Sequence, residues 1–176
     1  MNRRIILWLL NQTPILLFVV VFLVIGSLSE RFLDLQNLLN ILIQSSSIGI
    51  AAVGMTFVLL TAGVDLSVGS FMFVAVAVTG KMVFSGQSIA LSFACGIIVG
   101  IAGGCVNAFV ITRLRVIAFI ATLAMLFVGR GFGLWITNTR AMNMPEEITE
   151  LGAARILGIP IPVIALMAVA LLSHWF

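Results

Sequence analysis

Long apolar runs separated by short polar segments dominate this sequence. The runs lack strand-like alternation of polar and apolar residues, and their length suits helices that span a bilayer. Because a chain in lipid must satisfy its backbone polar groups internally, such runs favour helices over a barrel. The pattern predicts a single transmembrane domain over residues 1–176 with about six spans, at residues 5–26, 42–62, 65–83, 89–111, 116–136 and 159–176.

Two longer polar segments interrupt this pattern. In Ser27–Asn40, charged residues alternate with leucines, which predicts a short interfacial helix that leads into the second span. In Thr137–Gly158, Pro145 is followed by Glu146 and Glu147, which is typical of the start of a helix. A short surface helix is expected there.

The composition is that of a chain embedded in a lipid bilayer. Hydrophobic residues make up 62% of it and charged residues 9%, and the mean hydropathy is +1.28. Soluble domains carry about a quarter of charged residues, so the fold class predicted is an all-α integral membrane protein. The net charge of +3 is small and spread along the chain, so no nucleic-acid partner is expected.

A polar break separates the second span from the third. Gly63 and Gly69 bound a turn that holds Asp65 and Ser67, and Ser70 follows directly. Asp65 and Ser67 are expected to cap the third helix, because a side-chain oxygen can accept an unpaired backbone N–H. A carboxylate between two membrane segments is costly, and two interpretations stay open. Asp65 is a helix cap at the membrane boundary, or it belongs to a translocation path or to a latch that holds the broken helices.

Arg130 lies about 14 residues into the fifth span, or about 20 Å from its start. A guanidinium at that depth must face other helices, a carbonyl, an acid or a wet cavity, unless it snorkels to the outer interface. Gln44, in the first turns of the second span, is also too polar for lipid and is expected to face other helices.

Glycines in the fourth span predict close helix packing. Gly96, Gly100 and Gly104 recur at every fourth residue, and Gly103 lies beside them. A stripe of small residues lets another helix approach closely.

The chain carries no recognisable catalytic chemistry. It has no Gly-x-x-x-x-Gly-Lys-Ser/Thr motif for a nucleotide, and its one histidine, His174, has no cysteine or carboxylate close in sequence. No serine is accompanied by a histidine and an acid, so no catalytic residue, metal or cofactor is expected. A membrane enzyme acting on lipids would need clustered acids, histidines or metal ligands at one membrane face, and the sequence offers none.

The stretch from Gly54 to Ser70, Gly-Met-Thr-Phe-Val-Leu-Leu-Thr-Ala-Gly-Val-Asp-Leu-Ser-Val-Gly-Ser, closely resembles the signature of the bacterial ribose-type ABC sugar permeases. That family also serves xylose, arabinose, galactosides and autoinducer-2. Three further stretches agree in the family's order: Asn37-Leu-Leu-Asn-Ile-Leu, Asn107-Ala-Phe-Val-Ile-Thr-Arg-Leu and Phe119-Ile-Ala-Thr-Leu-Ala-Met-Leu-Phe-Val-Gly-Arg-Gly. The resemblance covers nearly the whole chain.

The resemblance implies a membrane subunit of a binding-protein-dependent importer of small sugars in the bacterial inner membrane. Its implied partners are an ABC ATPase subunit, a periplasmic or extracellular sugar-binding protein and a second permease subunit. Candidates for the translocation path or the helix break are Gln44, Gly63, Asp65, Ser67, Gly69, Ser70, Asn107 and Arg130.

Family members are nearly twice as long and continue into a cytoplasmic loop that contacts the ATPase. The alternative is therefore a truncated or inactive permease remnant, which associates with membrane partners without transporting alone.

Overall fold

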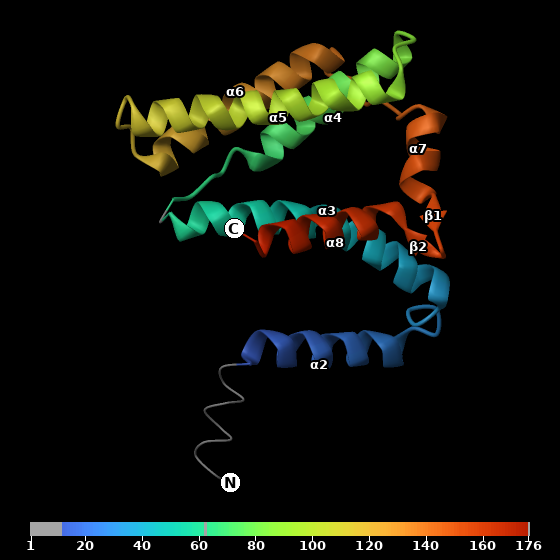
Figure 1. The fold of residues 1–176 in the computed structure, drawn as a ribbon. Coiled ribbons are helices and arrows are strands. Elements are labelled where there is room, and N and C mark those ends of the chain that lie inside the picture. Colours follow the sequence, from blue (N-terminus) through green and yellow to red (C-terminus); the bar gives the residue numbers. More distant parts are fainter. Residues whose placement is uncertain (1–11, 62, 176) are drawn as a thin grey trace, which may run out of the picture. The chain divides into compact units, whose positions relative to one another are not determined.

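A computed structural model describes residues 12–61 and 63–175 (Figure 1). The chain divides into two compact units, residues 1–45 and 46–176, and each is described by itself. Most of the described residues are helical, as the apolar pattern predicted. The first part of the first predicted span, residues 5–11, lies outside the described residues.

The first unit is a helix, a tight turn and the start of a second helix. Helix α2 spans Thr13–Leu28, with Pro14 in its first turn, where a missing N–H costs nothing. In the following turn the ring of Phe32 meets that of Phe22 edge-on, with 5.1 Å between centroids. The side-chain amide of Asn37 donates to the carbonyl of Phe32 at 2.8 Å.

The separate interfacial helix predicted in Ser27–Asn40 is wrong. Helix α2 continues to Leu28, a turn follows, and helix α3 runs without interruption over Leu35–Leu60. Its 26 residues measure about 39 Å at 1.5 Å per residue, more than the hydrocarbon thickness of about 30 Å. Leu35, Leu38 and Leu39 of the predicted interfacial segment therefore form the first turns of the long helix itself.

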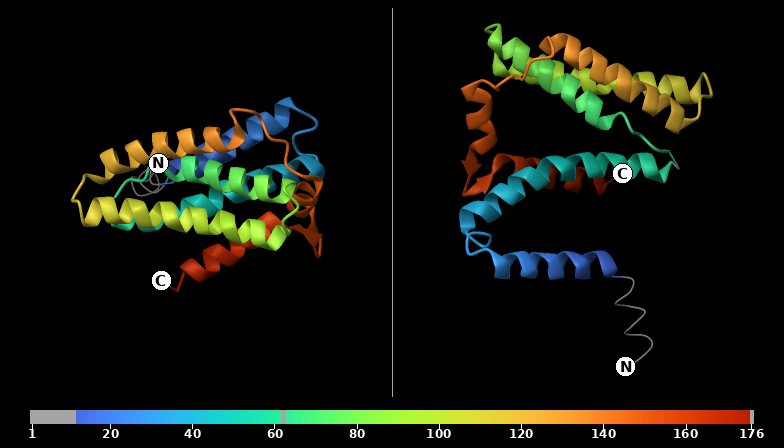
Figure 2. Two further views of the ribbon diagram at one scale, coloured as in Figure 1. Left: turned by 90° about the horizontal axis from the view of Figure 1, so that it is seen from above. Right: turned by 180° about the vertical axis from the view of Figure 1, so that it is seen from behind.

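Three antiparallel helices form the packed centre of the second unit. They are α4 (Val68–Phe84), α5 (Ile89–Thr112) and α6 (Ala118–Thr137). Helix α4 packs against both α5 and α6 more extensively than those two pack on each other, and both views in Figure 2 show α4 running beside them. The buried core consists of Val74, Ala77 and Ile136, with Val78 and Val99 packed against it.

Glycines set how closely α5 and α6 approach α4. A methyl group added at Gly96 would collide with the Thr79 hydroxyl, and one at Gly103 would collide with the ring of Phe71. At Gly100 and Gly104, by contrast, no atom lies within 4 Å of the added carbon. The predicted packing stripe therefore makes its contact at Gly96 but not at Gly100 or Gly104 within the described chain.

Helical geometry explains this difference. At 100° per residue, Gly103 and Asn107 each lie within about 20° of the direction of Gly96 on α5, whereas Gly104 is rotated by about 80° from it. The line that includes Gly96 faces α4, and Gly100 and Gly104 lie progressively to its side. A repeat of four residues drifts away from a fixed contact, so a stripe at that spacing cannot pack on one neighbour along its whole length.

The C-terminal segment contains a short helix, a small hairpin and a last apolar helix. Helix α7 spans Glu146–Ala153 with Pro145 at its N-cap and two glutamates in its first turn, so the surface helix expected there is present. Strands β1 (Arg155–Ile156) and β2 (Ile159–Pro160) form an antiparallel hairpin that was not predicted. Helix α8 spans Ile161–Ser173, and its Leu166 lies against Gly49 of α3.

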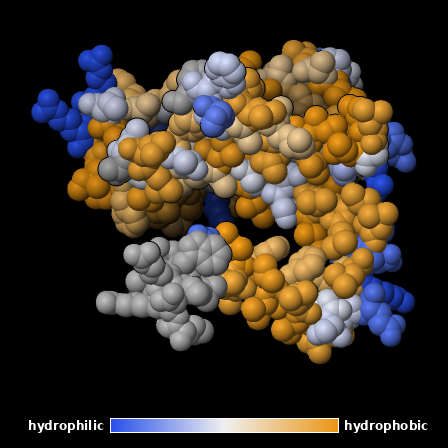
Figure 3. Space-filling view, turned by 60° about the horizontal axis from the view of Figure 1, so that its bottom comes forward, coloured by the Kyte–Doolittle hydropathy of each residue, from blue (hydrophilic) through white to orange (hydrophobic). Residues whose placement is uncertain are grey.

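Three described helices are long and apolar enough to cross a membrane, namely α3, α5 and α6. Helices α2, α4 and α8 are apolar but shorter, and the 17 residues of α4 measure about 26 Å. Large apolar side chains remain exposed along these helices, and hydrophobic residues cover most of the face shown in Figure 3. The fold class is that of an all-α membrane protein, and the count of six spans stays a prediction.

Candidate functional site

The break between α3 and α4 is organised by the carboxylate of Asp65. One of its oxygens, Oδ1, accepts hydrogen bonds from the backbone N–H of Ser67 at 2.8 Å and from the Ser67 hydroxyl at 2.6 Å. Ser67 is the N-cap residue of α4, yet its own side chain makes no capping bond. Of the two predicted caps, therefore, only Asp65 satisfies a backbone N–H, and α4 starts at Val68 rather than at residue 65.

Asn107 ties α5 to this break. Its amide Nδ2 donates to the Ser67 hydroxyl at 2.8 Å and lies 3.5 Å from the second oxygen of Asp65. Ser67 is 0% exposed and Asn107 is 4% exposed. The amide oxygen of Asn107 is buried and has no hydrogen-bond partner among the described residues. An unsatisfied buried acceptor costs about 1–3 kcal/mol. This group of side chains is therefore buried, and one of its acceptors lacks a hydrogen bond.

Helix α6 holds the same break from its other side. The hydroxyl of Thr122 is shared between the carbonyl of Ala118 in its own helix, at 2.8 Å, and the carbonyl of Val64 in the break, at 3.2 Å. The hydroxyl of Ser70 donates to the carbonyl of Ser67 at 2.7 Å and lies 3.4 Å from that of Met125 in α6. Ser70 packs directly on Gly129, where a β-carbon would lie 2.6 Å from its hydroxyl oxygen. The break is therefore bonded to both neighbouring helices by short polar side chains. We call Asp65, Ser67, Ser70, Asn107 and Thr122 the junction network.

A recess of about 250 Å³ opens beside the junction network. Asp65, Ser67 and Asn107 form its polar end, and Gly100 and Gly104 contribute the open side of α5. The two glycines that do not pack on α4 thus border a hollow that ends at a carboxylate.

Arg130 lies apart from the junction network. It projects from α6 twelve residues after Ala118, or about 18 Å along the helix. Its side chain is exposed and lines a second recess, of about 330 Å³, with Gly69, Phe73 and Leu134. The structure has no ion pair between Arg130 and Asp65, which line separate recesses.

The remaining predicted residues do not join these clusters. Gly63 lies just beyond the end of α3, and its N–H donates to the carbonyl of Val58 at 3.1 Å. Gln44 is exposed on α3 and belongs to the first unit. Conversely, sequence reasoning missed Thr122, whose hydroxyl in the apolar first half of α6 was the available signal.

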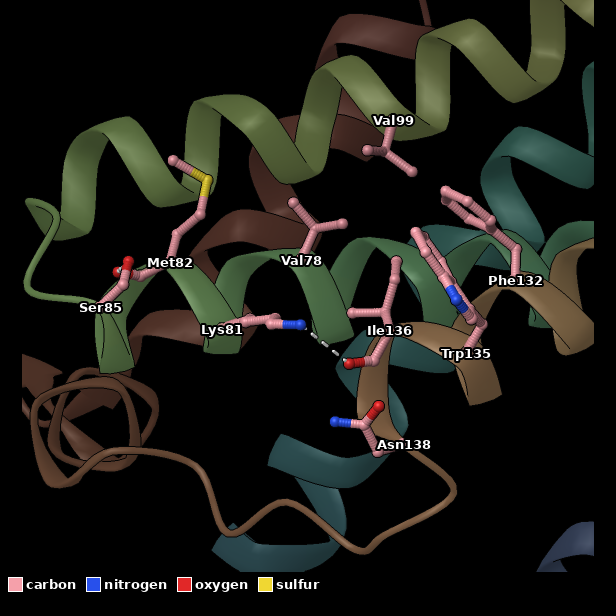
Figure 4. Close-up of a pocket in the computed structure, with 9 residues that line it drawn as sticks. All are labelled: Val78, Lys81, Met82, Ser85, Val99, Phe132, Trp135, Ile136 and Asn138. Atoms are coloured by element: carbon pink, nitrogen blue, oxygen red, sulfur yellow. Dashed lines mark hydrogen bonds between the residues drawn. The ribbon is translucent and has the colours of Figure 1, made fainter.

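A third and larger recess lies between the ends of α4 and α6. It has a volume of about 680 Å³, and Figure 4 shows Lys81 reaching across it toward the backbone of Ile136. The Lys81 ammonium donates to that carbonyl at 3.3 Å. Among the described residues no group of three His, Cys, Asp or Glu side chains could hold a metal ion.

An apolar helical chain with polar groups gathered at a helix break defines an integral membrane protein with an internal polar site. The chain belongs to the family described as branched-chain amino acid transport system / permease component, whose model matches residues 37–176. Together with the relatives described next, this match confirms the membership that the Gly54–Ser70 stretch predicted.

Curated relatives agree with this family. The ribose import permease protein of Escherichia coli (strain K12) is 37% identical over 174 residues, which cover 96% of this chain and 54% of that protein. The L-arabinose ABC transporter permease protein of Azospirillum brasilense is 35% identical over 88% of this chain and 46% of its own length. The autoinducer 2 import system permease protein of Salmonella typhi is 30% identical over 94% and 48%. The chain thus spans about half the length of the relatives it matches, and no solved structure matches it significantly.

Proposed function

We propose that this chain acts as a membrane subunit of a binding-protein-dependent ABC importer that moves a monosaccharide or related small sugar across the bacterial inner membrane. The observation that carries the proposal is the 37% identity with a ribose import permease over 96% of the chain. The sequence has no nucleotide-binding motif, so an ATPase subunit supplies the free energy. A second permease subunit completes the path, and an external binding protein delivers the sugar.

The junction network joins α4, α5 and α6 in a way that would let them move together as one rigid body. Hydrogen bonds from α5 and α6 hold the break before α4 through Asn107 and Thr122. A polar break that is bonded on two sides can transmit a rigid-body shift of these helices between outward-open and inward-open states. In this role Asp65 organises the break, because it accepts two hydrogen bonds from Ser67.

Arg130 suits a polar contact in the translocation path. The described chain offers it no ion pair or hydrogen bond that would offset the cost of a guanidinium within a span. Its five N–H donors can bond sugar hydroxyls, and Gly69 leaves the facing side of the recess open. These features favour a role toward a passing substrate over a structural one.

The test is reconstitution of the chain in proteoliposomes with the cognate ATPase subunit. Sugar-loaded binding protein should stimulate ATP hydrolysis and drive sugar accumulation, and unloaded binding protein should do so less. The matched control contains the ATPase and binding protein without this chain. Association of the chain with the ATPase without any stimulation would instead support the inactive remnant.

A further inference from the structure

The recess between the ends of α4 and α6 is amphipathic along its length. Its polar groups come from the helix ends: Lys81, Ser85 at the C-cap of α4, and Asn138 at the C-cap of α6. Val78 precedes Ser85 by two helical turns, about 10 Å along the axis, and lies in the apolar part with Val99. Figure 4 shows these groups around one hollow.

Lys81 is a cation without an anionic partner in the described part of the chain. It is the one lysine of the sequence. Its ammonium donates to the carbonyl of Ile136, and the C-terminal ends of α4 and α6 favour a positive charge there. A carbonyl occupies one of its three N–H donors but does not neutralise the charge. The recess therefore retains a positive charge and unused donors at its polar end.

Aromatic side chains form one wall of the same recess. Trp135 is 71% exposed and stacks on Phe132 with 5.5 Å between ring centroids. Tryptophan prefers the membrane–water interface, where its ring meets lipid and its N–H meets the polar layer. The recess thus combines a cation, an interfacial aromatic ring and an apolar wall.

We propose that this recess binds one anionic phospholipid. The phosphate pairs with the Lys81 ammonium, and an acyl chain lies along Val78, Val99 and Phe132. A phospholipid carries its charge at one end and apolar carbon at the other, which matches the segregation of groups in the recess. A sugar carries hydroxyls around its whole ring and would leave most of them facing apolar side chains. The proposal does not depend on the transport function.

Fluorescence of Trp135 can test this proposal on the full chain. Replacing Trp8 and Trp175 by Phe leaves Trp135 as the only tryptophan. The protein is reconstituted in phosphatidylcholine bilayers and titrated with acyl-brominated phosphatidylglycerol or acyl-brominated phosphatidylcholine, which quench the fluorescence on contact. One lysine near the surface predicts a preference of about fivefold for phosphatidylglycerol.

The variant Lys81→Gln should reduce that preference to about one, and Lys81→Arg should retain it. Arg140→Gln is the matched control, because Arg140 follows α6 at the same end but does not line the recess. Equal quenching by the two lipids in the unsubstituted protein would refute the proposal, as would an equal loss in the Lys81→Gln and Arg140→Gln proteins. Quenching that millimolar inorganic phosphate abolishes would assign the site to a free anion and also overturn it.

Discussion

Two glycines on α6, Gly129 and Gly131, should respond in opposite directions to the same substitution. In Gly129→Ala the new carbon would lie 2.6 Å from the Ser70 hydroxyl oxygen and 2.9 Å from the Ser70 β-carbon. Ser70 is 3% exposed and its hydroxyl is bonded to the carbonyl of Ser67 at 2.7 Å. The side chain therefore has no free space into which it can withdraw.

The magnitude follows from three contributions. Overpacking of a tight contact costs about 1–3 kcal/mol, and loss of the Ser70 hydrogen bond costs about 1 kcal/mol. The better helix propensity of alanine returns up to about 1 kcal/mol. Gly129→Ala should therefore lower the free energy of unfolding by about 1–3 kcal/mol. At Gly131 nothing lies within 4 Å of the new carbon, so Gly131→Ala should raise it by up to about 1 kcal/mol.

Unfolding in bicelles, followed by helical circular dichroism during an SDS titration, measures both variants against the unsubstituted chain. The double variant Gly129→Ala/Ser70→Ala should lose less than the sum of its single variants, because removal of the hydroxyl relieves the shortest contact. Equal stability of Gly129→Ala and Gly131→Ala would refute the reasoning, since it would mean that α6 does not approach α4 at Gly129.

Three further outcomes are expected. Ser67→Ala should lower the free energy of unfolding by about 2–4 kcal/mol, because its charge-assisted bond to Asp65 is lost and the buried amide of Asn107 loses its acceptor. Asn107→Ala should lower it by about 1 kcal/mol or less, since this change also removes the unsatisfied amide oxygen. The reverse order in the same titration would contradict the hydrogen bonds of the junction network. Arg130→Ala in the reconstituted importer should reduce sugar uptake by about tenfold or more while membrane insertion, measured by alkaline extraction, stays normal, and unchanged uptake would exclude a role in the path. A topology reporter fused after Arg115 should be cytoplasmic and one fused after Glu150 external, because the loop with Arg113 and Arg115 is short, basic and free of acids, and such loops stay on the cytoplasmic side. The opposite pattern would invert the orientation.

Much of the helical architecture could be predicted from composition and periodicity. The apolar runs predicted helices because lipid leaves backbone groups no other partners, and Pro145 with its two glutamates predicted α7 because both residue types suit a helix start. The polar break between α3 and α4 was also recognised, since glycines bound it and an acid lies within it. These are properties of residues close together in the chain.

The exact helix boundaries depended on more than local pattern. The segment before the second span was predicted as a separate interfacial helix, but α3 starts at Leu35 and continues to Leu60. Once a helix has formed, each added residue contributes another backbone hydrogen bond. A mixed polar and apolar segment next to a long helix can therefore extend it, and composition alone cannot distinguish the two outcomes.

The sequence by itself determined the membrane class, the position of the break and the residue types that could serve a site. Only the tertiary structure decided which of them meet. Ser67 and Asn107 are forty residues apart and bond to each other, whereas Asp65 and Arg130 line separate recesses. Gly96 packs on α4 and Gly104 does not, because the rotation of α5 about its axis is set by side chains from other helices. Local pattern specifies helices, but the contacts between them depend on how distant side chains fit together.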